Sequence, residues 1–319
     1  MPANLTPQYL EAEKRFRNAK TTEEKIVYLQ EMLALIPKHK GTEKLQAEIK
    51  SRLSKLRKEQ NQKSQIRRAV WYHIEKQGAG QVAVFGAPNV GKSSIVKVLT
   101  NASTEVAPYP FTTTTPIAGM MIYEDIQIQL IDCPPLTEDS PPWYFHILRS
   151  ADSNVFVIDT VDDNLVESTE ICLKRLRDTN ILPSPDSQIP AKPMIVVANK
   201  TDEPNALLGI EIIKEMISDL PIVPVSTKTF EGLEDLKAKI FKSLDIIRVY
   251  TKPPGKPPDL TEPVIIKKGS TILDAGKTLH KDFAQNLKFA RLWDGDKYHG
   301  QRVERNHILK DKDIVEFHI

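Results

Sequence analysis

The sequence holds only two cysteines among 319 residues, Cys133 and Cys172, which excludes a fold held together by several disulfides. Long hydrophobic runs are missing as well, because no uninterrupted apolar stretch exceeds the five residues 194–198. This excludes a membrane-spanning helix. The first residues lack the apolar segment of a secretory signal. We therefore expect a cytoplasmic protein with no membrane segment.

A net charge is nearly absent, at +2, but the charges are unevenly distributed. Residues 1–80 carry 17 Lys and Arg against 9 Asp and Glu, whereas residues 81–250 carry 14 against 23. Residues 251–319 are again slightly basic, with 13 against 10. Such alternation indicates three modules with different partners.

Residues 1–78 have the pattern of an α-helical hairpin. Thr6 before Pro7, and the spacing of Thr21 and Glu24, are typical of helix starts. Apolar residues recur at helical spacing, first at Ile26, Leu29, Leu33 and Ile36 and then at Leu45, Ile49, Leu53 and Leu56. The second arm is basic over residues 50–68, which fits either a solvated helix face or a phosphate-binding surface.

Residues 79–250 alternate between short apolar runs and helical intervals. The runs lie at 82–85, 121–132, 154–159, 194–199 and 221–226, and only residues 121–132 look like an antiparallel pair. Strands separated by helices predict an α/β domain with a mostly parallel sheet, here of six strands.

The segment 251–262 is rich in proline and predicts a stiff, extended linker. The tail, residues 263–319, alternates apolar and polar residues between glycines and predicts a small β domain. We expect one short helix in it, near Ala275 to Asp282.

The string Gly86-Ala87-Pro88-Asn89-Val90-Gly91-Lys92-Ser93 follows an expected strand and opens an expected helix. GxxxxGK[ST] in that context is the phosphate-binding P-loop, whose main-chain N–H groups point at phosphate oxygens. Lys92 then supplies a charge for the β and γ phosphates, and the Ser93 hydroxyl is a ligand for Mg²⁺. The pattern predicts that the protein binds a nucleoside triphosphate.

The base is indicated by Asn199-Lys200-Thr201-Asp202, which follows the expected strand 194–199. The Asp202 carboxylate can accept from the N1–H and N2–H₂ groups of guanine, whereas adenine offers neither donor. Asn199 can contact the base or tie this loop to the P-loop, and the Lys200 stem can cover the ring. Ser226-Thr227-Lys228 fits a further base-contacting loop, a weaker indication on its own.

Asp132 ends the strand before residue 133, where a carboxylate can hold Mg²⁺ through water. Between it and the P-loop lies the segment 109–116, which contains four consecutive threonines, Thr112 to Thr115. This segment can give a second hydroxyl to Mg²⁺, or it can be an ordinary polar loop.

The motifs GAPNVGKSS, YPFTTTTP and NKTD together resemble those of the Obg-type GTPases, and especially the branch of developmentally regulated GTP-binding proteins. The tail resembles a TGS domain, a ubiquitin-like β-grasp module, and the N-terminal hairpin also resembles that of this branch. The resemblance covers nearly the whole chain. It implies a Ras-like P-loop domain and an Mg²⁺-dependent GTPase that binds GTP and GDP. It also implies work near ribosomes or RNA, with a possible regulatory protein as partner.

Taken residue by residue, the resemblance matches Thr113 to the Mg²⁺-sensing threonine and Asn89 to an asparagine that helps hold K⁺. Leu136 stands where Ras-like enzymes carry a water-orienting glutamine. We expect catalytic roles for Lys92, Thr113 and Asp132, and Mg²⁺ contacts from Ser93, Thr113 and Asp132. We expect nucleotide contacts from Ala87, Pro88, Asn89, Val90, Gly91, Lys92, Ser93, Ser94, Asn199, Lys200, Asp202, Ser226, Thr227 and Lys228.

One departure from the family pattern is Pro135, because the family has glycine there. Proline has no N–H to donate to the γ-phosphate and fixes its own φ. We therefore expect slow hydrolysis with nucleotide affinity retained, and two functions stay open. The protein is either a GTPase switch or a GTP-binding adaptor with little turnover; an ATP-dependent enzyme is disfavoured by Asp202. Trp71, Tyr72 and Trp293 can stack on RNA bases or serve as packing residues.

Overall fold

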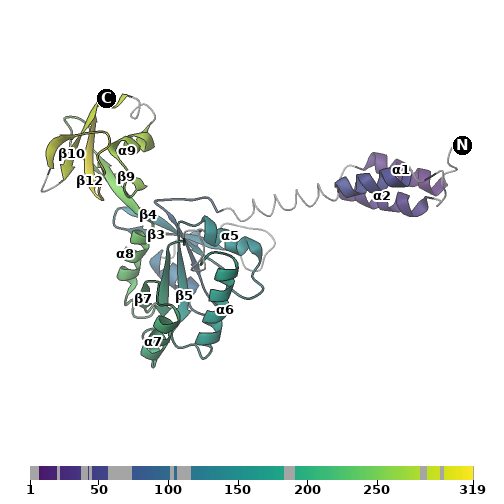
Figure 1. The fold of residues 1–319 in the computed structure, drawn as a ribbon, viewed down its shortest axis with the longest axis horizontal. Helices are drawn as coiled ribbons and strands as arrows, with labels where there is room; N and C mark the ends of the chain where they lie inside the picture. Colours follow the sequence, from purple (N-terminus) through teal and green to yellow (C-terminus); the bar gives the residue numbers. More distant parts are fainter. Residues whose placement is uncertain are drawn as a thin grey trace. The chain divides into compact units, whose positions relative to one another are not determined.

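The computed structural model describes residues 7–19, 22–36, 42, 45–56, 74–100, 104–105, 116–182, 191–280, 286–294 and 298–318. The chain divides into two compact units, residues 1–73 and 74–319 (Figure 1). No helix in the described ranges is both long and apolar enough to cross a membrane.

The N-terminal unit is helical throughout its described part. It contains α1 (Pro7–Asn18), α2 (Thr22–Leu35) and a further helical stretch over residues 45–56. The helices bury one shared core, to which Tyr9, Leu29 and Ile49 contribute. Of the expected basic arm, residues 50, 52 and 55 are exposed, whereas residues 57–73, including Trp71 and Tyr72, lie outside the described ranges.

The larger sheet of the second unit has seven strands in the order β2-β3-β4-β1-β5-β6-β7. They are β1 (Gln81–Phe85), β2 (Thr104–Glu105), β3 (Ile117–Tyr123), β4 (Ile126–Asp132), β5 (Ser153–Asp159), β6 (Met194–Asn199) and β7 (Ile222–Val225). Four strand pairs are parallel, and β3 is antiparallel to both β2 and β4. The mostly parallel α/β sheet expected from the sequence is confirmed; the additional strand is β2, only two residues long.

Helices flank this sheet, with α8 on one side and α5 and α6 on the other (Figure 1). The helices are α4 (Lys92–Leu99), α5 (Pro142–Ser150), α6 (Leu165–Asp178), α7 (Ala206–Met216) and α8 (Leu233–Ser243). Strands β1, β5 and β6 are buried along their whole length, because helices cover both faces. In the core the rings of Phe85 and Phe156, from neighbouring strands, stack with centroids 5.0 Å apart.

The C-terminal sheet has five strands in the order β11-β10-β12-β8-β9. Its elements are β8 (Ile246–Thr251), β9 (Asp259–Lys267), α9 (Ile272–Leu279), β10 (Phe289–Asp294), β11 (Tyr298–Val303) and β12 (Asp313–His318). Helix α9 begins with a capping box between Thr271 and Asp274 and packs Ile272 and Ala275 into the core of this domain. The β-grasp type of tail domain expected from the sequence is present.

The boundary between the two sheets differs from the expected one. We expect from the sequence a GTPase-type domain up to residue 250, a linker at 251–262 and a tail from 263. In the structure β8 already pairs with β9 and β12, so the C-terminal domain begins near residue 246. Residues 252–258 connect two strands of one sheet. The alternating Ile247 and Val249 are buried in the C-terminal core, which is why β8 belongs there.

Candidate functional site

The P-loop connects β1 to α4 and needs glycine at two positions. A Cβ on Gly86 would lie 2.3 Å from the main-chain oxygen of Val157, and a Cβ on Gly91 would lie 2.3 Å from Nδ2 of Asn199. Gly91 also has a φ of +90°, in the left-handed region that other residues rarely adopt. Only glycine therefore lets this loop curl against β5 and β6.

The Lys92 side chain is folded into the loop. Its ammonium nitrogen Nζ donates a hydrogen bond to the main-chain oxygen of Ala87 at 2.7 Å, and the residue is only 6% exposed. Burial lowers the pKa of Lys92, and the nearby Asp132 carboxylate opposes that shift. A positive charge held this close to the loop suits a polyanionic ligand such as a triphosphate.

Asp132 and Ser93 form the oxygen-rich side of the same site. Burial is the largest influence and raises the pKa of Asp132. The Ser93 hydroxyl and the charge of Lys92 both lower the pKa of the neighbouring Asp132 carboxylate. Among the described residues its Oδ1 is buried without a hydrogen-bond partner, which is costly unless a cation or water completes it. A carboxylate and a hydroxyl side by side, with one carboxylate oxygen unpaired, fit a hard cation such as Mg²⁺.

A pocket of about 470 Å³ opens at these residues. Its walls bring together residues that are far apart in the sequence: Asn89, Gly91, Lys92, Ser93, Ser94, Ile117, Asp132, Cys133, Pro134 and Pro135. Ile117 opens β3 next to the end of β4, and no sequence motif marks it as a site residue. The expected role of Thr113 falls outside the described residues.

The chain after Asp132 is anchored to the P-loop by its backbone. The N–H of Cys133 donates to the oxygen of Val84, and the N–H of Leu136 donates to the oxygen of Gly86, both at 2.9 Å. The Leu136 side chain is 2% exposed and packs in the core, so it does not line the pocket. Pro135 between them is exposed at the pocket wall. Burial raises the pKa of the Cys133 thiol far above its usual range, which makes it a packing residue.

Asn199 ties the end of β6 to the P-loop. Its Nδ2 donates to the main-chain oxygen of Val90 at 2.9 Å, and the residue is 1% exposed. Of the two roles open for Asn199 from the sequence, the structure shows the tie between loops. Its Oδ1 is buried without a partner in the described residues.

Asp202 is held in place by the loop after β7. The Ser226 hydroxyl donates to Oδ1 of Asp202 at 2.6 Å, and the ammonium of Lys228 lies 3.4 Å from Oδ2. The hydrogen bond from Ser226 is the main cause of the lowered pKa of Asp202. The same hydroxyl oxygen accepts from the N–H groups of Lys228 and Thr229. The structure thus brings Asp202 and Ser226-Thr227-Lys228 together, with the carboxylate ionised.

Lys200 has a partner that the sequence did not indicate. Its ammonium pairs with Oδ2 of Asp159, at the end of β5, and Lys200 has a φ of +66°. The neighbouring Thr160 hydroxyl donates to the main-chain oxygen of Asn199 at 2.9 Å. The only available signal was the position of Asp159 at the end of an apolar run, since a carboxylate there faces the same sheet edge.

All of these residues follow the carboxyl ends of β1, β4, β5, β6 and β7, so they share one edge of the sheet. Ligands of open α/β sheets bind at that edge. The phosphate-type residues gather at β1 and β4, and the base-type residues at β6 and β7. One elongated ligand with an anionic end and a hydrogen-bonding ring therefore fits this edge.

Comparison with known proteins agrees with this geometry. Residues 81–200 match the family model of the 50S ribosome-binding GTPase, and residues 247–319 match the TGS domain. The match to the TGS domain begins within β8, which is also the first strand of the C-terminal sheet. The chain thus contains a GTPase domain followed by a TGS domain.

Similar proteins span nearly the whole chain. An uncharacterized GTP-binding protein of Methanocaldococcus jannaschii is 29% identical over 92% of this chain and 92% of its own length. The human developmentally-regulated GTP-binding protein 2 is 24% identical over 92% of this chain and 98% of its own. The solved structure of the Schizosaccharomyces pombe YchF GTPase shares the fold, with a TM-score of 0.52 and 14% identity, over 77% of this chain and 100% of that one.

Proposed function

We propose that this chain, in which a GTPase domain is followed by a TGS domain, is a GTP-binding protein of the developmentally regulated type. In this proposal it hydrolyses GTP to GDP and phosphate as a switch associated with ribosomes or RNA. The observation that supports this most directly is the placement of Lys92, Ser93 and Asp132 around one pocket. Asp202 stands at the same sheet edge and gives the site its means to select guanine.

The P-loop and its neighbours bind and orient the triphosphate. Main-chain N–H groups of residues 89–93 and the start of α4 donate to the phosphate oxygens, and Lys92 leaves the Ala87 oxygen to neutralise the β and γ phosphates. Ser93 and Asp132 would hold Mg²⁺, which supplies charge stabilisation when bound. We assign a third Mg²⁺ contact to Thr113 and a K⁺ contact to Asn89.

The base loops select the purine. The ionised Asp202 carboxylate accepts from both donors of the guanine edge, and an adenine would leave a carboxylate oxygen unpaired. Ser226 fixes the carboxylate so that it needs no reorientation on binding. The anchored Lys200 stem covers the ring, since its ammonium is already held by Asp159.

Turnover is slow in this proposal, because the wall of the pocket lacks two groups that assist hydrolysis. Pro135 has no N–H for the γ-phosphate, and the Leu136 side chain is buried and apolar. The same two observations favour the second candidate, a GTP-binding adaptor with no meaningful turnover. The intact Lys92, Ser93 and Asp132 favour the switch.

A multiple-turnover phosphate-release assay separates the two candidates, run with and without ribosomes and in K⁺ against Na⁺. The switch predicts slow release of phosphate that ribosomes and K⁺ accelerate. Absence of turnover in every condition supports the adaptor.

Pro135→Gly restores a potential N–H donor and is expected to raise kcat, with GDP affinity unchanged. A variant that turns over no faster than wild type shows that Pro135 does not limit hydrolysis.

We further propose that the protein acts in the cytoplasm and binds ribosomes or RNA there. The match to a ribosome-binding GTPase model supports it, as do the TGS domain and the exposed residues Lys50, Arg52 and Lys55. Co-sedimentation with ribosomes should fall with salt if phosphates are contacted. Binding that ignores salt, or requires an added regulatory protein, points to a protein partner instead.

A further inference from the structure

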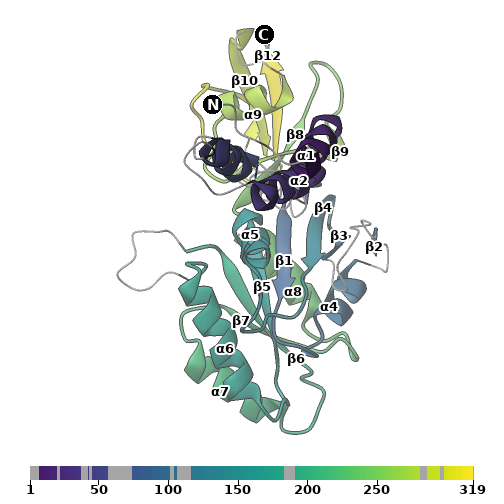
Figure 2. The ribbon, with the colours of Figure 1, turned by 90° about the vertical axis from the view of Figure 1, so that its right-hand side faces the viewer.

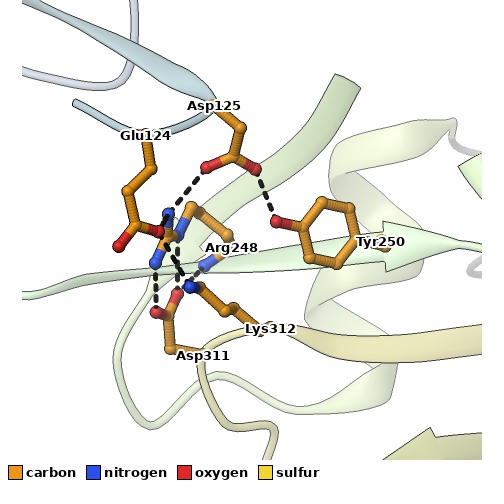
Figure 3. A network of polar contacts seen from close by, with 6 residues as sticks. All are labelled: Glu124, Asp125, Arg248, Tyr250, Asp311 and Lys312. Carbon is orange, nitrogen blue, oxygen red and sulfur yellow. Dashed lines mark hydrogen bonds and ion pairs between the residues drawn. The ribbon is translucent and has the colours of Figure 1, made fainter. Parts of the chain in front are cut away.

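A cluster of charged residues joins the TGS domain to the tip of the β3–β4 hairpin (Figure 3). At its centre Arg248 of β8 has a side chain only 2% exposed. The guanidinium contacts three carboxylates, and two further residues complete the cluster: Glu124, Asp125, Asp311, Lys312 and Tyr250. We call these six residues the Arg248 cluster.

The contacts on the two sides of Arg248 differ in origin. Asp311, from the TGS domain, receives a bidentate pair of hydrogen bonds at 3.1 and 2.7 Å. Glu124 and Asp125, from the hairpin turn, each receive a bond from Nη1 at 2.6 Å. The Tyr250 hydroxyl donates to Asp125, and Lys312 pairs with Glu124 at 2.8 Å. Both carboxylates of the turn are thus held by side chains of the TGS domain (Figure 3).

The hairpin held at this tip starts and ends at the nucleotide pocket. Ile117, the first residue of β3, and Asp132, the last of β4, face each other in the ladder and both line the pocket. Seven consecutive residue pairs join the two strands without interruption. The ribbon is therefore about 20 Å long, at roughly 3.3 Å per residue, with the pocket at one end and the Arg248 cluster at the other.

The tip half of the ribbon extends beyond the ladder that β4 forms with β1. Strand β1 pairs with β4 only at residues 129–132, next to the pocket. Figure 2 shows β1, β4 and β3 side by side. Farther along, Gly78 bridges Ile128 and the N–H of Ala79 donates to the oxygen of Gln127 at 2.7 Å. The turn beyond them is braced by the Arg248 cluster and by Phe241 of α8. The Phe241 ring stacks on Tyr123 and lies 4.9 Å from the Arg248 guanidinium carbon.

We propose that nucleotide state and TGS docking are thermodynamically linked through the β3–β4 hairpin, with the Arg248 cluster as the contact that carries the linkage. The inference rests on the guanine-nucleotide binding proposed above. A triphosphate that contacts the ends of the ribbon at Ile117 and Asp132 restrains it, and the restrained tip holds the TGS domain more firmly. Linkage is reciprocal, so a partner that displaces the TGS domain changes the preference for GTP over GDP by the same factor.

Hydrogen exchange of the full chain measures the linkage at two amides of the cluster. The N–H of Arg248 donates to Asp311 and the N–H of Lys312 donates to the oxygen of Arg248, both at 2.8 Å. We expect both amides to exchange at least about threefold more slowly with a non-hydrolysable GTP analogue and Mg²⁺ than with GDP. Equal exchange in the two states, while the P-loop amides do respond, overturns the linkage.

Variants separate the cluster from general damage. Arg248→Met should abolish the nucleotide-dependent difference at Lys312 and leave that of the P-loop amides. Lys252→Met is the matched control, because it removes a cation that directly follows the same strand and whose partner, Glu316, lies within the TGS domain. If Arg248→Met misfolds, the double change Glu124→Gln with Asp125→Asn weakens the hairpin side alone. If the exchange rate at the Lys312 amide still differs between the two nucleotides in the cluster variants, the Arg248 cluster does not carry the linkage. If neither nucleotide changes the exchange of the P-loop amides, the proposed function is refuted instead.

Discussion

Replacing Gly91 by alanine tests how tightly the P-loop and the base loop are fitted together. Gly91 has a φ of +90°, and a Cβ there would lie 2.3 Å from Nδ2 of Asn199. That nitrogen donates to the Val90 oxygen in a region where Asn199 is 1% exposed. The methyl group therefore strains the backbone and displaces a buried donor from its acceptor.

The two costs can be estimated separately. A left-handed φ at a residue with a Cβ costs about 1–2 kcal/mol. A buried amide that loses its hydrogen-bond partner costs about 1–3 kcal/mol more. We expect Gly91→Ala to lower the free energy of unfolding by about 2–5 kcal/mol, a large share of the ~5–15 kcal/mol typical of a domain.

Gly255→Ala is the matched control, because Gly255 has a φ of +72° but nothing within 4 Å of its Cβ position. Gly255→Ala should lower the free energy of unfolding only by the cost of the left-handed φ, about 1–2 kcal/mol. Urea denaturation of both variants gives the difference, and Gly91→Ala should be less harmful when Asn199 is already alanine. Equal losses for the two glycine variants, or no relief in the Asn199→Ala background, would refute the contact between the loops.

Three further predictions follow from the site and the Arg248 cluster. Lys92→Ala should weaken binding of GTP by more than roughly tenfold and abolish turnover, because no other described cation lines the pocket. Fluorescent-nucleotide titration measures the affinity, and phosphate release measures the turnover. Asp202→Asn should weaken GDP binding and favour xanthosine diphosphate, whose edge offers one donor and one acceptor; competition binding against GDP measures this. Hydrogen bonds from Lys312, and to a smaller extent from Arg248, lower the pKa of Glu124. The contribution of Glu124 to TGS docking is therefore complete above pH ~4.5 and is lost as the pH falls through the lowered pKa. Exchange at the Lys312 amide should therefore accelerate in acid relative to the P-loop amides, and unchanged relative rates would contradict this.

The P-loop could be predicted from the sequence because the residues that form it are consecutive in the chain. The string from Gly86 to Ser93 specifies a strand, a loop and a helix start, and the structure has β1, the loop and α4 there. The placement of Asp132 and Asp202 at strand ends could be predicted in the same way, since carboxyl ends of parallel strands share an edge.

The long-range contacts could not be predicted, because nothing local encodes them. Arg248 sits in an apolar run that reads as the end of the first domain, yet its partners lie in the turn at residues 124–125 and at Asp311. Likewise the pairing of Lys200 with Asp159 depends on the neighbouring register of β5 and β6. The proline-rich segment 251–262 predicts a linker because proline interrupts strands, but only residues 252–258 do so here, and they connect two strands of a single sheet.

Binding of a guanine nucleotide at this sheet edge, with its phosphates on the P-loop, underlies the proposed function. The most direct measurement is competition for bound fluorescent GDP, in Mg²⁺, by unlabelled GTP and ATP. We predict that GTP displaces the label at concentrations comparable to that of the label, and that ATP fails at a hundredfold excess. Displacement by ATP as effective as that by GTP, or no binding of the labelled GDP, would contradict the account.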